Sequence, residues 1–328
     1  MSRSVKFTFG IAILVGLSAL HLFAGTTTLA FSDFFESLFH YDQSSTNHII
    51  ARDLRIPRLI ITIIAGAGLS IAGLLMQTIF KNPLAEPNIL GVSTGSSLFV
   101  ALTTLSGISL FQNDLGIIGS ALLGAFIFGG IILIFTRYMK YQGSLLLIGI
   151  MLGSFSASII NVIQTYSDAN QLKSFTIWSM GSMQQVTFTQ LPFIIVVFCL
   201  GFILSFFLAR PLNAMILGDT NASMLGINIK NTRLVSIIIT AIFAGLITAY
   251  CGPIAFIGMA VPNLVKMIFK TNDHLTLILG NTIIGALFLL TCDIIVQLIA
   301  VHFIVPINAI TSLIGVPFII FIIIKRWS

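Results

Sequence analysis

Charged residues are scarce in this chain, and their scarcity excludes most classes of soluble protein. Asp, Glu, Lys and Arg make up 8% of the 328 residues, against roughly 25% in soluble domains. Hydrophobic residues reach 57%, and the mean hydropathy is +1.06. This composition predicts an all-α, polytopic membrane protein whose helices of about 20 residues leave no length for a folded soluble domain.

Motifs for catalysis and metal binding are also absent from the sequence. No Gly-Lys-Ser phosphate loop occurs, so we expect this chain not to hydrolyse ATP itself. The three cysteines show no metal spacing, and no histidine has a cysteine or an acid at ligand spacing on its own predicted helix. A membrane-embedded enzyme would need paired carboxylates or a metal cluster. We therefore expect no catalytic residue, no metal site and no cofactor in this chain.

Long apolar runs separated by charges and turn residues predict about ten transmembrane helices. They cover residues 7–24, 59–80, 89–106, 115–136, 145–163, 190–209, 234–250, 253–269, 275–301 and 307–324. An even number of spans places both termini on one side of the membrane. We expect the first span to be retained, because it lacks a clear small-x-small cleavage site.

The distribution of basic residues predicts that both termini are cytosolic. With that orientation, twelve of the 16 lysines and arginines fall on the cytosolic side, as the positive-inside rule requires. The four outward basic residues are Arg52, Arg55, Arg58 and Lys173. Topology therefore accounts for most of the net charge of +6 without a nucleic-acid partner.

Three of the outward basic residues crowd into the segment RDLRIPR at the mouth of the second predicted span. Arg52, Arg55 and Arg58 either anchor the helix start by snorkelling to the lipid headgroups or form a docking patch. A guanidinium pairs bidentately with carboxylates, so such a patch would suit an acidic partner surface.

The residues that follow decide between these readings. The segments LRIPRLIITIIAGAGLSIAGLLMQ and KNPLAEPNILGVSTGS are joined later by WSMGS, LGDTNASMLGINI, GPIAFIGMAVPNLVK and VPINAI. In this order they resemble the permease family of type II ABC importers for iron siderophores, haem and cobalamin. The resemblance extends over nearly the whole chain, so residues 1–328 are expected to form a single transmembrane permease domain.

The resemblance implies a set of partners and a place in the cell. Such a permease pairs with a second permease subunit, as a homodimer or a heterodimer, with the path at the subunit interface. Two separate ATPase subunits bind ATP and Mg²⁺, and an extracytoplasmic binding protein or lipoprotein delivers the cargo. The expected location is the cytoplasmic (inner) membrane of a bacterium, and binding-protein docking falls to Arg52, Arg55 and Arg58.

The longest cytosolic connection, residues 210–233, is where the resemblance places the contact with the ATPase. Its segment LGDTNASMLG predicts a short amphipathic helix with an acid in the first turn and a glycine at the end. The alternative is a plain structured loop. The residues expected to couple to the ATPase are Leu217, Gly218, Asp219, Met224, Leu225 and Gly226.

Small residues, prolines and isolated polar residues in the spans mark the translocation path or its gates. Small residues permit close helix packing, and proline kinks a helix. In the family the second span lies near the path, so packing and path lining are both open for its glycines. The candidates are Gly66, Gly68, Gln77, Gly252, Pro253, Pro262, Asn263, Asp293 and Gln297.

Several positions depart from the family pattern. Asn263 and Lys266 stand where relatives usually carry His and Arg, and Gln297 stands where relatives carry an arginine that could pair with Asp293. Asn308 replaces a usual glycine. A specialised half of a heterodimer, a divergent subfamily and simple drift all remain open. Glu86, in the turn after the second span, is expected to be a solvated loop charge.

The function that follows is uptake of an iron-siderophore complex, with haem or cobalamin as the second choice of cargo. The rival is a self-sufficient secondary transporter or channel driven by an ion gradient. That rival requires a charged relay within the membrane, for which the sequence offers Asp293 alone.

Overall fold

Helices form every regular element in the described part of the chain. The structure is a computed structural model that describes residues 2–25, 27, 30–105, 114–138, 142–300 and 305–327, and no strand occurs in these ranges. The prediction of an all-α protein is therefore confirmed.

Seven helical segments in the described ranges are long and apolar enough to cross a membrane, and three shorter apolar helices accompany them. Each of the ten predicted spans has its counterpart in this set. These ten are α1 (Arg3–Phe23), α4 (Ile56–Ile79), α5 (Val92–Leu105), α6 (Asp114–Tyr138), α7 (Gln142–Thr165), α9 (Leu191–Phe207), α12 (Ile229–Cys251), α13 (Ile257–Phe269), α14 (His274–Ile299) and α15 (Ile307–Trp327). The remaining elements are short: α2 (Phe31–Phe39), α3 (Thr46–Ile49), η1 (Ile50–Arg55), η2 (Pro87–Leu90), α8 (Ala169–Ser179), η4 (Phe188–Gln190), α10 (Ala209–Ile216) and α11 (Asp219–Met224).

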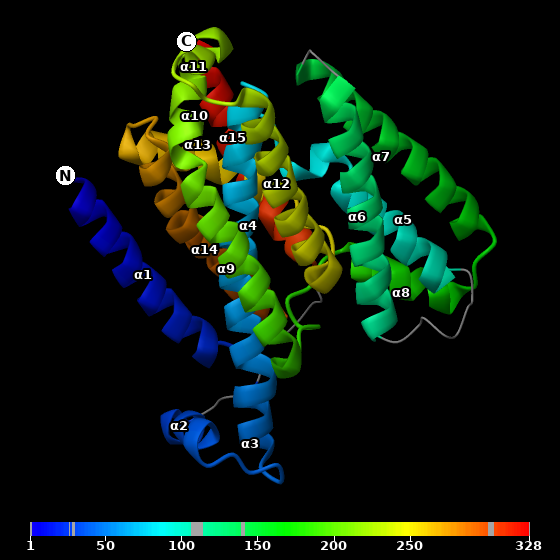
Figure 1. Cartoon of the computed structure of the whole chain (residues 1–328). Coiled ribbons are helices and arrows are strands. Elements are labelled where there is room, and N and C mark those ends of the chain that lie inside the picture. The colour runs from blue at the N-terminus through cyan, green and yellow to red at the C-terminus, as the bar shows by residue number, and fades with distance from the viewer. Residues whose placement is uncertain are drawn as a thin grey trace.

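Helix α4 forms the centre of the bundle (Figure 1), packed against α14, α12, α13 and α9. In its membrane-length segment 83% of the residues are buried, whereas α1 and α7 bury only 11% of theirs. Helices that are apolar on all sides lie either in the protein interior or against lipid. The high burial of α4 indicates the interior, and the low burial of α1 and α7 indicates contact with lipid. Helices α5, α6, α7 and α8 pack together beside this centre.

Glycines bring α4 into backbone contact with two neighbouring helices. A Cβ atom on Gly66 would lie 2.2 Å from the carbonyl oxygen of Gly285 in α14. A Cβ atom on Gly73 would lie 1.9 Å from the carbonyl oxygen of Gly258 in α13. Small residues allow this approach, which is how helices associate where lipid gives no hydrophobic drive.

Side-chain caps fix the starts of several helices. The Asn228 carboxamide accepts a hydrogen bond from the backbone N–H of Asn231 at the start of α12. The carboxylate of Asp273 does the same for Thr276 in α14. Such caps satisfy backbone donors that the first turn leaves unpaired. The capping carboxylate therefore sets where α14 begins.

The rod that contains α4 begins earlier than the sequence predicted. Segments α3, η1 and α4 run on as one helical stretch, Thr46–Ile79, so the helix extends well beyond the expected start at residue 59. Pro57 is tolerated because it lies at the first turn of α4, just after the π-helical segment η1. With α2, the start of this rod protrudes from the bundle (Figure 1).

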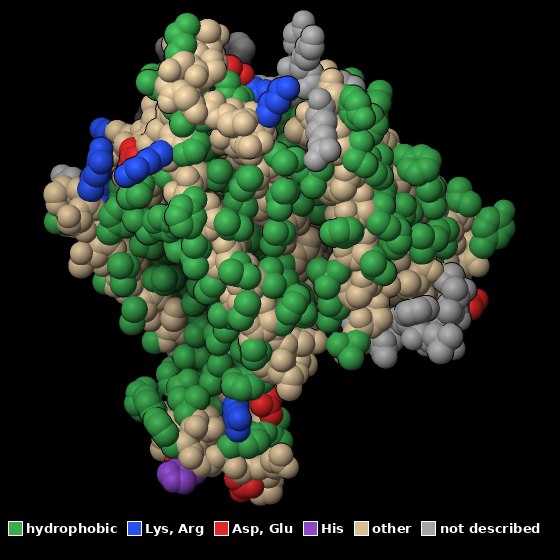
Figure 2. Space-filling view, viewed as in Figure 1, with side chains coloured by type: hydrophobic (Ala, Val, Ile, Leu, Met, Phe, Trp, Pro, Cys, Tyr) green, Lys and Arg blue, Asp and Glu red, His purple; other side chains and the backbone are tan. Residues whose placement is uncertain are grey.

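Charged side chains gather at the two ends of the bundle. We call the end that carries α10, α11 and both chain termini the terminal end, and the end that carries α2 and α3 the protruding end. Figure 2 shows hydrophobic side chains across the middle of the visible face and Lys and Arg side chains near the terminal end. The protrusion carries acidic side chains, a histidine and a basic side chain, and acidic side chains also lie near the terminal end. This pattern fits a membrane belt between two aqueous faces.

Candidate functional site

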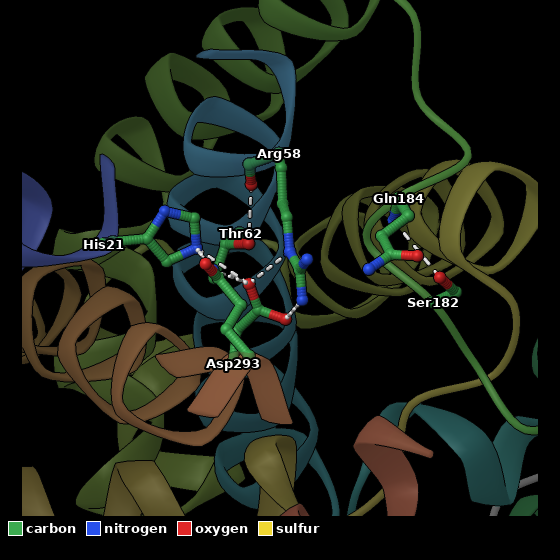
Figure 3. Close-up of polar contacts among 7 residues, drawn as sticks. His21, Arg58, Thr62, Ser182, Gln184 and Asp293 are labelled. Carbon is green, nitrogen blue, oxygen red and sulfur yellow. Dashed lines mark hydrogen bonds and ion pairs between the residues drawn. The ribbon is translucent and has the colours of Figure 1, made fainter. Parts of the chain in front are cut away.

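A buried ion cluster lies toward the protruding end, where three helices meet (Figure 3). Asp293 of α14 is 1% exposed, and Arg58 of α4 donates to both of its oxygens, Nε to Oδ2 and Nη2 to Oδ1, each at 2.8 Å. Nε2 of His21 in α1 lies 2.7 Å from the same Oδ2. Gln297, one turn further along α14, donates its Nε2 to Oδ2 at 3.2 Å. The carboxylate is therefore saturated by partners from α1, α4 and α14.

This cluster provides the charged partners of Asp293 that the sequence did not reveal. The expected partner of Asp293 was an arginine at the position that Gln297 occupies, but Arg58 provides the guanidinium from another helix. His21 is also a partner, although no acid lies near it on its own helix. A buried charge is tolerated when it is paired and hydrogen-bonded. Asp293 thus forms a buried ion pair with Arg58 in this conformation.

The three outward arginines do not form one exposed cluster, so that expectation is wrong for two of them. Arg55 is 7% exposed and donates to the backbone carbonyl oxygens of Leu22 and Thr27. Arg58 is engaged with Asp293. Both side chains turn into the protein because the helical rod carries them past the loop that follows α1.

Arg52 keeps its guanidinium near the surface of the protrusion. Its central carbon lies 4.3 Å from the centroid of the Tyr41 ring and 5.2 Å from that of Phe188. Guanidinium groups stack on aromatic faces in this way and keep their edges open to hydrogen bonding. Arg52 is half-buried, as Arg58 is, whereas Arg55 is buried.

A cavity of about 420 Å³ opens beside the ion cluster. Arg55, Arg58, Gln184 and Gln297 line it together with His21. In Figure 3 Gln184 lies across from Arg58, on the segment that follows α8. Two guanidiniums and two carboxamides thus face one space, a combination suited to carboxylate oxygens.

A larger cavity of about 780 Å³ lies at the terminal end. Two path candidates, Gln77 and Asn263, line it beside Lys266. Gln77 accepts from the Lys266 ammonium at 3.2 Å and donates to the carbonyl oxygen of Met259 at 3.1 Å. Asn263 donates to the carbonyl oxygen of Pro83 at 2.8 Å. These two amides therefore tie α13 to the end of α4 and to the turn that follows it.

Between α12 and α13 the backbone leaves helical geometry, as Gly252 and Pro253 predicted. Gly252 has φ +73°, and a Cβ atom there would lie 2.3 Å from the Trp178 carbonyl oxygen. Asn308 bridges the break, because it donates to the carbonyl oxygen of Pro253 at 2.6 Å and accepts from the backbone N–H of Ala255 at 3.1 Å. Asn308 of α15 thus fixes the backbone of Pro253 and Ala255 through its side chain.

Pro262 lies inside α13, and the two glycine candidates of α4 are packing residues. Pro262 is buried and lies in the middle of that short helix, which continues through it. Gly66 abuts α14, and a Cβ atom on Gly68 would meet Ile247 of α12 at 3.1 Å. Neither glycine lines either of the two cavities. Both glycines therefore make packing contacts with neighbouring helices, and their place on the translocation path stays a prediction.

The expected amphipathic helix is present as α11, and its apolar side chains point away from the bundle. Leu217, Met224 and Leu225 are 62%, 79% and 64% exposed. Gly218 and Gly226 bracket the helix with φ of +102° and +79°. These side chains form an exposed apolar patch, a feature typical of interaction surfaces.

Asp219, in the first turn of α11, holds that helix to the bundle. Its carboxylate accepts from Lys81 at 3.1 Å and from Arg233 of α12. Partial desolvation acts to raise the pKa of Asp219, but the hydrogen bonds and charges of these two cations outweigh it and lower the pKa. The two cations place α11 against the ends of α4 and α12.

Glu86, expected in solvent, is instead half-buried in the turn between α4 and α5. Its Oε2 has no hydrogen-bond partner among the described residues. Burial raises the pKa of this carboxyl, although hydrogen bonds from Asn88 and the backbone of Phe256 act in the opposite direction. The expectation is therefore wrong, because α13 folds back over the turn.

Comparison with known proteins identifies the family. The family model described as "FecCD transport family" matches residues 12–325. The chain belongs to the FecCD transport family. It is accordingly a membrane permease with multiple membrane-spanning helices.

Two relatives and one solved structure are similar to this chain over most of its length. The hemin transport system permease protein HmuU of Yersinia pestis is 33% identical and covers 89% of this chain and 88% of its own. The iron(3+)-hydroxamate import system permease protein FhuB of Bacillus subtilis is 33% identical, with coverages of 95% and 83%. A metal-chelate type ABC transporter solved in an inward-facing conformation is 26% identical, with a TM-score of 0.84 over 99% of this chain and 100% of its own.

Proposed function

We propose that this FecCD-family chain is the permease subunit of an ATP-driven importer that moves an iron-siderophore complex into the cytoplasm, with haem or cobalamin as second choices of cargo. The observation that carries the proposal is the family match over residues 12–325. The relatives named above are permeases for hemin and for iron(3+)-hydroxamate, which supports an iron chelate as cargo.

The membrane orientation follows from the charged ends. Lys81, Arg233, Lys266 and Lys270 all lie at helix ends near the terminal end, so the positive-inside rule makes that end cytosolic, with both chain termini. The exposed apolar residues of α11 then face the cytosol, where a separate ATPase binds ATP and Mg²⁺. A second permease subunit, identical or different, and a second ATPase complete the assembly.

On the outer side, the binding protein docks on the protrusion. An acidic side chain of the partner pairs with Arg52, because this guanidinium stacks on the Tyr41 ring by its face and leaves its edge open to hydrogen bonding. It reaches Arg55 and Arg58 only by entering the cavity that both line. The three arginines thus keep a docking role in the proposal, at two different depths.

The rival function, a transporter driven by an ion gradient, lacks support at its only candidate site. Asp293 is engaged by Arg58 and His21 and has no second membrane carboxylate beside it among the described residues. A proton or cation relay needs a carboxylate that can release its partners. The cluster therefore favours a structural role over ion coupling.

Reconstitution in vesicles tests the proposal. Vesicles that contain this chain with its ATPase and binding protein should accumulate a ferric siderophore only when ATP is supplied. Accumulation by the chain alone along an ion gradient would show that the importer assignment is wrong.

A pair of methionine variants tests the coupling surface. Met224→Ala removes the most exposed apolar side chain of α11 and should reduce stimulation of the ATPase by about 5- to 30-fold, the effect of about 1–2 kcal/mol at a contact. Met180→Ala is the control, because Met180 is also exposed but lies after α8. Equal ATPase stimulation by the two variants would show that α11 does not contact the ATPase.

A further inference from the structure

The larger cavity, at the terminal end, has a charge pattern that the transport assignment does not use. Lys81, Lys266 and Lys270 line it. None of the described lining residues is acidic. Asn263 and Asn272 add carboxamide donors. Such a set of donors favours an anion with several oxygen atoms.

Among the described residues, the carboxylates of Asp219 and Asp273 lie near this cavity but are engaged by other groups. Asp219 contacts Lys81 but shares its charge with Arg233. Asp273 follows Asn272 in the chain, yet it accepts hydrogen bonds from Asn213 and from the backbone and side chain of Thr276. These hydrogen bonds, against some desolvation, lower the pKa of Asp273 to about 2. Its charge is thus committed to the cap of α14.

Another part of the cavity wall is apolar and continues onto the surface. Met215, Ile216, Met267, Leu277 and Ile322 line it. Ile216 is 47% exposed and Met267 36% exposed. A small soluble anion would contact only the lysines and amides. An amphiphile would cover both the basic and the apolar parts.

The position of the lysines matches a membrane surface. Lys81 follows the end of α4, and Lys266 and Lys270 lie in the last turn and at the C-cap of α13. Basic pockets between transmembrane helices at the cytosolic rim bind anionic lipid headgroups. We propose that this cavity binds the phosphate headgroup of an anionic phospholipid, with an acyl chain along Ile216 and Met267.

The site connects to α11 through one shared residue. Lys81 both lines the cavity and pairs with Asp219, and this pair is solvent-exposed, at 48% and 38% of the two side chains. A phosphate in the cavity competes with Asp219 for the same ammonium. Asp219→Asn should therefore strengthen lipid binding, whereas loss of a cavity lysine should weaken it.

Native mass spectrometry of the full-length chain in a neutral detergent tests the site with three probes. Dioctanoyl phosphatidylglycerol should bind, and dioctanoyl phosphatidylcholine should bind at least about tenfold more weakly, because its headgroup has no net charge. Inorganic phosphate supplies the anion without acyl chains and should also bind more weakly than phosphatidylglycerol. Phosphate binding as tight as that of phosphatidylglycerol would overturn the lipid assignment in favour of a free anion.

Lysine variants locate the binding. Lys270→Gln, at an exposed position, should weaken phosphatidylglycerol binding about fivefold, and Lys266→Gln with Lys270→Gln about 25-fold, since one basic residue near a membrane surface contributes about 1 kcal/mol. Lys270→Arg keeps the charge and should restore binding. Lys230→Gln is the matched control, because Lys230 is exposed in the first turn of α12 and does not line the cavity. Equal binding by Lys270→Gln and Lys230→Gln, or equal binding of the two lipids, would refute the site.

Discussion

Loss of the Asp293 carboxylate should destabilise this protein far more than loss of an exposed ion pair. Asp293→Asn keeps the size of the side chain but leaves the Arg58 guanidinium without its anion. The side chains of Arg58 and Asp293 are 13% and 2% exposed, so the two charges are largely desolvated. His21 also loses a charged acceptor.

The expected loss of unfolding free energy follows from the burial of this ion pair. Removing one member of a buried ion pair costs about 3–5 kcal/mol, chiefly because the other charge stays desolvated. The asparagine oxygen can still accept one hydrogen bond from Arg58, so we expect about 3 kcal/mol. For Lys81→Gln, where 48% and 38% of the two side chains are exposed, the expected cost is about 0.2–1 kcal/mol.

The assay is equilibrium unfolding of the purified chain in mixed micelles, titrated with a denaturing detergent. Lys81→Gln is the control, because it also breaks an Asp–cation pair of similar length at the other end of the bundle. Comparable losses of unfolding free energy in the two variants would refute the argument from burial. So would a double variant, Arg58→Met with Asp293→Leu, that is less stable than Asp293→Asn, because removing both charges leaves neither one unpaired.

The other predictions concern the half-buried acid Glu86 and a helix contact. Glu86→Gln should raise the thermal unfolding midpoint at about pH 8 and leave it nearly unchanged near pH 4. The pKa of Glu86 is raised in the folded state, so this carboxyl contributes its full stability below its unfolded-state pKa and loses that stability as the pH rises through its folded-state pKa. A larger gain at the acidic pH would contradict this. Gly66→Ala should lower the unfolding free energy by about 1–3 kcal/mol, since its methyl group would meet the Gly285 backbone, whereas Gly16→Ala, with no atom within 4 Å, should not. Equal effects of the two alanines would mean that α4 and α14 separate easily.

Local sequence patterns were sufficient to place the membrane helices and α11. Apolar runs between charges define spans directly, because lipid requires every backbone group to be paired within its own helix. The short helix after Gly218 was visible from Asp219 in its first turn and Gly226 at its end. These signals are read within a few residues of each other, so no tertiary information is needed.

The partners of the charged residues could not be predicted, because they come from distant parts of the chain. Arg58 and Asp293 are 235 positions apart, and His21 and Asp293 are 272 apart. The run of three arginines predicted a common outward face, but the rod from Thr46 to Ile79 turns Arg55 inward. The partial burial of Glu86 likewise depends on how α13 folds over its turn. No single-sequence pattern carries this information.

The attachments of α4 limit where the bundle can move during transport. Its protruding end is fixed to α14 by Arg58 and Asp293, and its middle is fixed to the same helix by the Gly66–Gly285 backbone contact. Close-packed interfaces of this kind shift between discrete arrangements and do not deform continuously. In contrast, the break after Gly252 has no helical hydrogen-bond ladder and is held mainly by side-chain amides such as Asn308. We therefore expect α4 and α14 to move as one unit and the break before α13 to absorb the change in geometry.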